Sequence, residues 1–253
     1  MDFPIIGVLG GMGPYAGLDL VSRIFDETRA ASDREHLPVA LLSYGHRITD
    51  RSGFVFGQTD INPGYAIAEL ALELERLGAA VGGIACNSAH APVIFDLVQQ
   101  KLRGRSIRIL HLIGETVRFI SETRPDACRI GCLSTYSVHQ HGLYQHAVEA
   151  AGLEAILPAD SVAEEVVHRA IYDPIFGIKA ISNPCTEKAI SLVRQAITHV
   201  QNRGADAVIL GCTELPLAVP PATCTVCIDP ARALARALIR ETSPQKLKPL
   251  GGM

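Results

Sequence analysis

The sequence lacks any run of lysines or arginines, and its 253 residues carry a formal net charge of −3. These two properties disfavour nucleic acid as a partner. No apolar stretch approaches the roughly 20 residues that a membrane-crossing helix needs. The first residues also lack the basic start and the cleavage site of a signal peptide. We therefore expect a cytoplasmic protein that binds neither nucleic acid nor membranes.

Seven cysteines in a chain of this length do not indicate a disulfide scaffold, and their number is odd. Cys224 and Cys227 form a single C-x-x-C pair inside an apolar run. A zinc site would need a second pair at a suitable spacing, and a redox pair would be expected to open a helix. We therefore predict that both are ordinary core or near-surface thiols, at or beside a strand at residues 225–228, and that they form no metal site.

The remaining composition suits a large globular core, since 48% of the residues are hydrophobic. Short apolar strands alternate with helical segments, which is typical of a parallel sheet with helices on both faces. We predict an α/β fold of two pseudo-symmetric domains, each a roughly four-stranded parallel sheet. The first domain would span residues 1–113 together with a C-terminal helix at about 229–242, and the second residues 114–228. We expect residues 243–253 to be a disordered tail.

The two predicted domains repeat one pattern, an apolar strand that ends next to a cysteine. Residues 79–85 lead to Cys86, and residues 207–211 lead to Cys212, 126 residues further along a 253-residue chain. The first strands of the two halves, near Ile6 and Ile130, are 124 residues apart. An internal duplication explains both offsets. The carboxyl ends of such strands are where α/β sheets bind ligands, so we predict an active site in the cleft between the domains.

A glycine-rich turn, Gly-Gly-Met-Gly-Pro at residues 10–14, follows the first strand. From Gly11 to Ala16 the sequence satisfies the dinucleotide-binding pattern G-x-G-x-x-A. A dinucleotide site should also have an acidic residue at the end of the second strand, where this chain has Ser43 and Tyr44. Two interpretations remain, an anion site made of backbone N–H groups at a helix start and a tight turn that needs glycine.

The paired cysteines suggest a particular chemistry. A single cysteine at a strand end is more often a small buried hydrophobic residue than a nucleophile. Each of these two, however, precedes residues that can bind a ligand through N–H, hydroxyl or carboxylate groups. These residues are Asn87, Ser88, Thr213 and Glu214. Nucleophilic hydrolysis needs one thiol and a base, whereas two equivalent thiols suit removing a proton from one face of a carbon and returning one to the other. The pattern therefore indicates racemisation or epimerisation.

Three segments, at residues 10–14, 86–90 and 211–216, resemble the motifs of the aspartate/glutamate racemase family in order and in spacing. The resemblance extends to about residue 240. It implies a cofactor-independent amino-acid racemase with Cys86 and Cys212 as catalytic residues, and a homodimer. Met12 and Glu214 fit the aspartate-racemase type, because glutamate racemases of the cell-wall type have an acid and a histidine at these places.

The resemblance also implies which residues bind the substrate, a small-molecule acidic amino acid that we take to be aspartate. The α-carboxylate would lie against the N–H groups and side chains of Asn87, Ser88 and Thr213. Glu214 is counted among the substrate-binding residues as well.

The distal carboxylate would be held by Arg51 with the Met12–Gly13 turn and Lys179, since an arginine fork can bind a carboxylate through two parallel hydrogen bonds. Arg47 is the alternative to Arg51 in the same polar loop.

The implied mechanism needs one cysteine as thiolate and the other as thiol, and a free cysteine has a pKa of about 8.5. Without a cofactor, the carbanion must be stabilised by preorganised donors in a closed site. Aspartate and glutamate differ by one methylene group, which changes the free energy of binding in a pocket by only about 1–3 kcal/mol. A glutamate or broad-specificity racemase is therefore an alternative. Further alternatives are a decarboxylase, a maleate-type cis–trans isomerase of the same superfamily, and a non-catalytic protein that binds a small anion.

Overall fold

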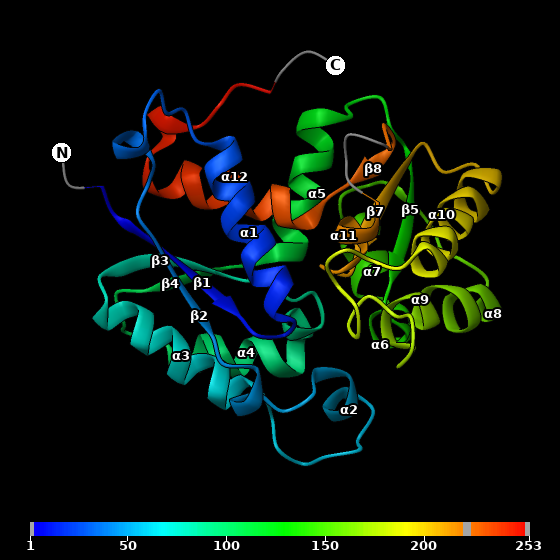
Figure 1. The fold of residues 1–253 in the computed structure, drawn as a ribbon, viewed down its shortest axis with the longest axis horizontal. Coiled ribbons are helices and arrows are strands. Elements are labelled where there is room, and N and C mark those ends of the chain that lie inside the picture. Colours follow the sequence, from blue (N-terminus) through cyan, green and yellow to red (C-terminus); the bar gives the residue numbers. More distant parts are fainter. Residues whose placement is uncertain (1–2, 220–223, 251–253) are drawn as a thin grey trace. The chain divides into compact units, whose positions relative to one another are not determined.

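The computed structural model describes residues 3–219 and 224–250 of the chain. The chain divides into two compact units, which we call unit 1 (Met1–Glu115 and Ala231–Met253) and unit 2 (Thr116–Pro230). Each contains a four-stranded sheet, in the order β2-β1-β3-β4 in unit 1 and β6-β5-β7-β8 in unit 2 (Figure 1). All the pairings are parallel. The two orders correspond strand for strand, and the predicted α/β fold with two similar halves is confirmed.

Unit 1 alternates strands and helices along the sequence. Its strands are β1 (Ile5–Gly10), β2 (Val39–Ser43), β3 (Ala79–Ile84) and β4 (Arg108–Leu110). Its helices are α1 (Pro14–Glu27), α2 (Arg51–Val55), α3 (Gly64–Arg76), α4 (Pro92–Lys101) and α12 (Pro230–Thr242), and α5 (Leu112–Thr123) crosses into unit 2. Short 3₁₀ turns lie at η1 (Asp33–Glu35), η2 (Gly45–Arg47), η3 (Ser88–His90) and η6 (Pro244–Lys246).

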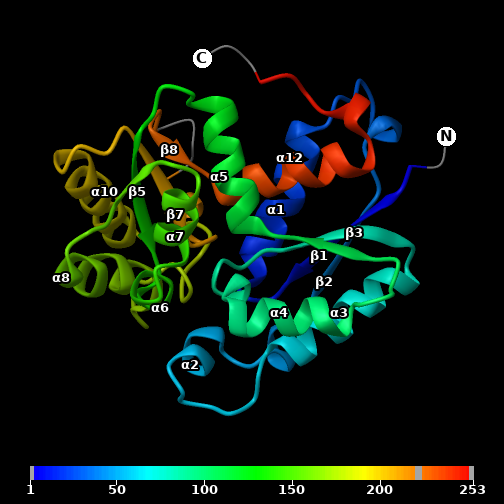
Figure 2. The ribbon, with the colours of Figure 1, turned by 180° about the vertical axis from the view of Figure 1, so that it is seen from behind.

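The sheet of unit 1 is covered on both faces. In Figures 1 and 2, α3 and α4 lie on one face of the sheet, whereas α1 and α12 lie on the other. Glycines in β3 allow this close packing, because a Cβ added at Gly83 would lie 2.8 Å from a methyl carbon of Leu234 in α12. The two central strands, β1 and β3, are almost fully buried between these layers. The carboxyl ends of β1 and β3 are therefore held rigidly beside each other.

A buried ion pair fastens α12 to α1. Glu27 at the end of α1 accepts hydrogen bonds from Arg236 and, at 2.5 Å, from Arg232 Nε. The following chain docks at the same place, where Lys248 N donates to Glu27 O at 2.9 Å and Thr28 forms a β-bridge with Leu247. The prediction of a disordered tail over residues 243–253 is therefore wrong for residues 243–250, because these long-range contacts fix them. Residues 251–253 lie outside the described part.

Unit 2 repeats the arrangement with shorter outer strands. Its strands are β5 (Arg129–Ser134), β6 (Glu154–Ile156), β7 (Ala207–Gly211) and β8 (Cys227–Ile228). Its helices are α6 (Tyr136–Gln140), α7 (Leu143–Ala150), α8 (Asp160–Val162), α9 (Arg169–Tyr172), α10 (Glu187–Asn202) and α11 (Leu215–Ala218), and a π-helical segment, η4 (Ala163–His168), connects α8 to α9.

The two faces of the unit 2 sheet are covered by different helices. A Cβ added at Gly131 in β5 would meet Val200 of α10, whereas one added at Gly211 in β7 would meet the ring of Tyr144 in α7. Helix α10 begins after Thr186, whose hydroxyl accepts a hydrogen bond from Ala189 N at 3.2 Å.

The two cysteines of the C-x-x-C pair are not the free thiols that the sequence predicts. Cys224 and Cys227 form a disulfide, and the strand there is only the two residues of β8. The chain turns between the two cysteines, with Cys227 N donating to Cys224 O at 3.1 Å, and this turn brings their sulfurs together. The prediction of two separate thiols is therefore wrong, and the strand predicted at residues 225–228 is shorter than expected.

Candidate functional site

The structure gathers the predicted site residues into two groups, one in each unit. In unit 1, Cys86 follows the carboxyl end of β3 and is 4% exposed. Its Sγ lies 3.4 Å from Ser88 Oγ, a predicted substrate-binding hydroxyl. Both backbone polar groups of Cys86 are hydrogen bonded, because its N–H donates to Ile84 O at 2.8 Å and its carbonyl oxygen lies 2.9 Å from His90 Nδ1. The thiol therefore sits on a backbone that is fixed on both sides.

The glycine turn after β1 lies next to this thiol in the same sheet. Ala85 N, one residue before Cys86, donates to Leu9 O in β1 at 3.0 Å. Gly11 has a φ of 91°, and a Cβ there would lie 2.5 Å from Gly45 N. Only glycine satisfies both requirements. The tight turn is thus a structural necessity, and it brings Met12 and Gly13 to the carboxyl edge of the sheet.

Arg51 lies against this turn, as predicted from the sequence resemblance. Its Nη2 lies 3.3 Å from Met12 O and its Nη1 3.4 Å from Thr49 O, and the residue is only 9% exposed. Helix α2, which begins at Arg51, also packs against η3 beside the Cys86 turn. Arg47 instead pairs with Glu69 at 2.9 Å in an exposed position. The geometry therefore favours Arg51 over Arg47 as the arginine of this group.

In unit 2, Cys212 follows the carboxyl end of β7 and is 5% exposed. Its Sγ donates to Glu214 Oε2 at 2.8 Å, and the other carboxylate oxygen, Oε1, accepts from Lys179 Nζ at 2.5 Å. Thr213 Oγ1 lies 3.4 Å from Glu214 Oε2. All four residues predicted in this half are thus joined in one network. Lys179 and Glu214 are 35 residues apart in sequence.

The charges of this network set the protonation of Cys212. Burial, and then the negative charge of Glu214, raise the pKa of Cys212 well above its usual value. Burial alone would lower the pKa of Lys179, but Glu214, together with Cys212 and Tyr172, raises it overall. At neutral pH, Cys212 is consequently a thiol and Lys179 an ammonium ion.

An aromatic wall that the sequence did not predict adjoins Lys179. The ammonium nitrogen of Lys179 lies 5.5 Å from the ring centroid of Tyr172, which stacks on His168 at 4.8 Å. Tyr136, which begins α6, meets His168 edge-on at 6.4 Å. His168 ends a π-helical segment, a feature found frequently at functional sites. Sequence reasoning could have found these rings from the spacing of His168 and Tyr172, because residues four apart are neighbours on one face of a helix.

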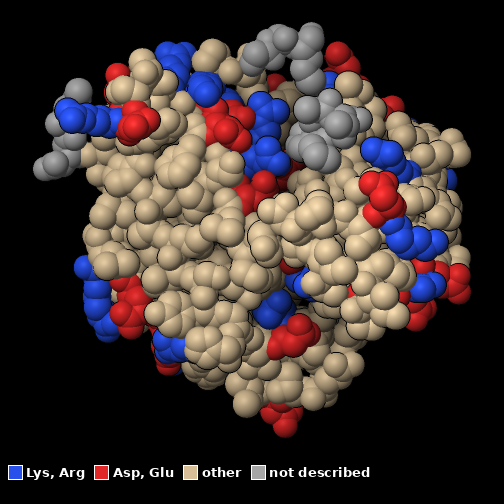
Figure 3. Space-filling model, in the orientation of Figure 1, with Lys and Arg blue, Asp and Glu red and all other residues tan. Residues whose placement is uncertain are grey.

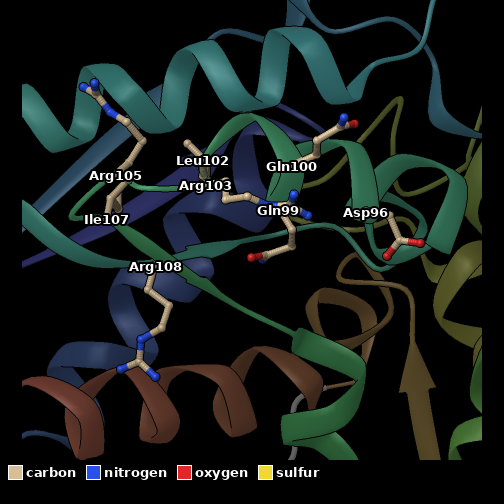
Figure 4. A pocket seen from close by; sticks show the side chains of 8 residues that line it. All are labelled: Asp96, Gln99, Gln100, Leu102, Arg103, Arg105, Ile107 and Arg108. Carbon is tan, nitrogen blue, oxygen red and sulfur yellow. The ribbon is translucent and has the colours of Figure 1, made fainter.

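A groove of about 560 Å³ lies elsewhere in unit 1 (Figure 4). It lies between the C-terminal end of α4 and the start of β4, at the sheet edge opposite to Cys86. Two of its arginines are already paired, Arg105 with Glu75 at 2.5 Å and Arg108 with Glu241 at 2.5 Å. The groove is therefore not a candidate for the predicted carboxylate site.

Within residues 3–219 and 224–250, no group of three His, Cys, Asp or Glu residues is placed to hold a metal ion. None of the helices described is both long and apolar enough to cross a membrane. On the face shown in Figure 3, acidic and basic side chains are interspersed among uncharged ones.

The fold is one of two similar α/β units, each with a buried cysteine after the third strand of its sheet, and comparisons with known proteins identify the family. The Asp/Glu/hydantoin racemase pattern matches residues 9–238, so the chain belongs to that family. It is an amino-acid racemase, and hence an isomerase, as the resemblance of its motifs predicted.

Three similar proteins illustrate the relationship. The structure of an aspartate racemase from Picrophilus torridus has a TM-score of 0.74 and 25% identity, covering 94% of this chain and 93% of that one. The structure of an aspartate racemase homologue from Pyrococcus horikoshii OT3 has a TM-score of 0.71 and 24% identity, covering 94% and 98%. A glutamate racemase from Koribacter versatilis is 27% identical over 251 residues, which is 94% of this chain and 74% of that protein.

Proposed function

We propose that this racemase interconverts L- and D-aspartate with Cys86 and Cys212 as its two proton-transferring groups. One observation carries the proposal. Each unit presents a buried cysteine after the third strand of its sheet, β3 in the order β2-β1-β3-β4 and β7 in the order β6-β5-β7-β8. The proposal requires the two sulfurs to reach opposite faces of one substrate α-carbon.

The protonation state of Cys212 gives the two cysteines different starting roles. Cys86 enters as thiolate and takes the α-proton, becoming a thiol. Cys212 then gives its proton to the other face of the carbanion and becomes a thiolate beside Glu214 and Lys179. The reverse reaction returns both protons. Lys179 offsets the repulsion between the Glu214 carboxylate and the new thiolate, which would otherwise oppose proton donation by Cys212.

The substrate's carboxylates are assigned to the predicted residues. Asn87, Ser88 and Thr213 meet the α-carboxylate, and Arg51 at the Met12–Gly13 turn meets the distal one, with Lys179 as a second cation. Because Glu214 is engaged by Cys212 Sγ and Lys179 Nζ, its contribution to substrate binding would come through these two residues. An arginine and a lysine against one side chain select an acidic amino acid.

Aspartate is proposed over glutamate for two reasons. The residues at positions 12 and 214 follow the aspartate-racemase pattern, and the Picrophilus torridus aspartate racemase covers nearly the full length of both chains. By the same resemblance, we propose that the enzyme is a cytoplasmic homodimer. Light scattering should then give a mass of about twice the 27.1 kDa of one chain.

The decisive experiment follows the circular dichroism of L- and D-aspartate incubated with pure protein, with glutamate and maleate in parallel. Aspartate should lose its optical activity from either enantiomer. Cys86→Ser and Cys212→Ser should each slow this by about 10²- to 10⁴-fold, the usual range for loss of a general acid or base. Cys132→Ser is a matched control, since Cys132 is also buried but lies within β5.

Three outcomes would contradict parts of the proposal. Racemisation at the parent rate in both serine variants would end the two-thiol mechanism. Racemisation of glutamate alone would reassign the substrate. Product formation from maleate without racemisation of either amino acid would overturn the proposed reaction.

A further inference from the structure

His90 is a buried imidazole that the proposed mechanism does not use. It ends the 3₁₀ turn η3 four residues after Cys86 and is 1% exposed. Its ring stacks on Phe95 of α4 at 4.9 Å between centroids, with 28° between the ring planes. His111, just before α5, packs edge-on against both rings, at 4.9 and 4.7 Å. The orientation of the His90 ring is therefore fixed by neighbours from two other segments.

One ring nitrogen points back at the backbone of the candidate catalytic cysteine. His90 Nδ1 lies 2.9 Å from Cys86 O. A carbonyl oxygen can only accept, so Nδ1 must carry the proton and donate it. Burial and the neighbouring His111 lower the pKa of His90 to about 3, so the ring is neutral at pH 7. The donor is thus a neutral imidazole held in one tautomer.

This hydrogen bond orients the peptide group between Cys86 and Asn87. In a planar trans peptide, the C=O and the following N–H point in opposite directions. When His90 holds the carbonyl of Cys86 on its own side, the N–H of Asn87 is directed to the other side. Asn87 is one of the residues proposed to meet the α-carboxylate. One contact therefore sets the direction of a proposed donor and the backbone from which the Cys86 thiol projects.

We propose that His90 is a positioning residue for Cys86, which fixes the thiol and the adjacent Asn87 N–H through its Nδ1–H hydrogen bond to the Cys86 carbonyl. The inference deepens the proposed function and rests on it for its effect on turnover. Its effect on the thiol itself does not depend on which reaction the enzyme catalyses.

Two substitutions separate the hydrogen bond from the shape of the ring. His90→Phe keeps a planar ring between Phe95 and His111 but has no donor. His90→Asn places an amide nitrogen where Nδ1 stands but loses the rest of the ring. A purely structural role of His90 would make the ring-preserving variant the better enzyme. The proposal predicts the opposite order.

The expected result is that His90→Phe lowers kcat for aspartate by about 10- to 100-fold, the size of effect produced by a misplacement of about 1 Å. His90→Asn should recover most of this loss, even where its thermal stability is lower than that of His90→Phe.

A second measurement follows the reactivity of the Cys86 thiol in the absence of substrate. Trypsin releases residues 77–101 as a peptide whose only cysteine is Cys86. The rate of alkylation of that cysteine by iodoacetamide, followed against pH by mass spectrometry, should change in His90→Phe and return towards the parent profile in His90→Asn.

His141 supplies the matched control. Its Nδ1 lies 2.9 Å from Ser137 O, also four residues earlier, but no cysteine stands at position 137. His141→Phe should leave both kcat and the alkylation of Cys86 at parent values.

The outcomes distinguish this inference from the proposed function. Parent-like kcat and parent-like alkylation of Cys86 in His90→Phe would overturn the role of His90 and leave the racemase assignment intact. If the parent protein racemises nothing, the alkylation profile still decides the role of His90. A variant order in which His90→Phe outperforms His90→Asn in both measurements would also refute the hydrogen-bond argument.

Discussion

The neutral, buried His90 predicts how the stability of unit 1 depends on pH. The pKa of His90 is lowered from 6.5 to about 3 in the folded protein, mainly by burial. Below pH 6.5 the unfolded chain therefore binds a proton that the folded chain does not. Proton binding favours the state that takes it up, so stability falls as the pH drops from 6.5 towards 3.

The size of this loss follows from the two pKa values. A single histidine with this shift costs the folded state about 1 kcal/mol at pH 5.5 and about 3 kcal/mol at pH 4.5, relative to pH 7.5. His90→Phe has no proton to bind at this position, so it should lose correspondingly less stability over the same range. His111, which is half-buried and also has a lowered pKa, remains in both proteins and contributes to both curves.

Backbone amide hydrogen exchange, followed by mass spectrometry, provides an assay specific to unit 1, because the strands β1 and β3 lie in its buried sheet. A pulse of deuterium oxide, with its length scaled to the intrinsic exchange rate at each pH, labels these amides only where unit 1 has opened. Labelling across a urea series at pH 7.5 and pH 4.5 gives the unfolding free energy of this unit for parent and variant. Parallel losses of stability in the two proteins would refute the claim that His90 is folded in a neutral state.

Three further predictions concern unit 2. Lys179→Met leaves the buried carboxylate of Glu214 without its cation, so it should destabilise unit 2 by about 3 kcal/mol, and the double variant with Glu214→Gln should recover most of that loss. The same Lys179→Met change should raise the pKa of Cys212 further and slow its alkylation near pH 8; faster alkylation would contradict the network described above. The disulfide between Cys224 and Cys227 predicts five titratable thiols in the denatured, unreduced protein, and a count of seven would refute it.

Much of the fold was predictable because its signals are local. Each unit is built from short apolar strands that end in small residues, and the spacing between Cys86 and Cys212 equals that of a repeated half. Glycines such as Gly11 stand where the backbone excludes a side chain, which is a requirement visible in sequence. The matching strand orders of the two sheets follow from this repetition.

The contacts that were missed are those between segments far apart in the chain. The docked tail depends on Glu27 meeting Arg236, a pair 209 residues apart. The Lys179–Glu214 pair links a loop to a strand end, and no local pattern specifies it. The Cys224–Cys227 disulfide was missed for a different reason, because it depends on a turn within an apolar run that reads as a strand.

The two thiols occupy equivalent places in the two sheets but differ in their surroundings. Cys86 lies beside a hydroxyl and above a neutral imidazole, whereas Cys212 lies within a carboxylate–ammonium pair. The two enantiomers have equal free energies in water, and both directions of racemisation pass through the same transition state. The activation free energy, measured from free enzyme and free substrate, is therefore the same in both directions. For the proposed substrate, aspartate, the values of kcat/KM for the two enantiomers must consequently be equal, however different the thiols are. The asymmetry can appear only in kcat and KM separately, because it changes the stability of the enzyme–substrate complex formed with each enantiomer. The charged pair around Cys212 would thus tune which enantiomer binds more tightly without favouring either product.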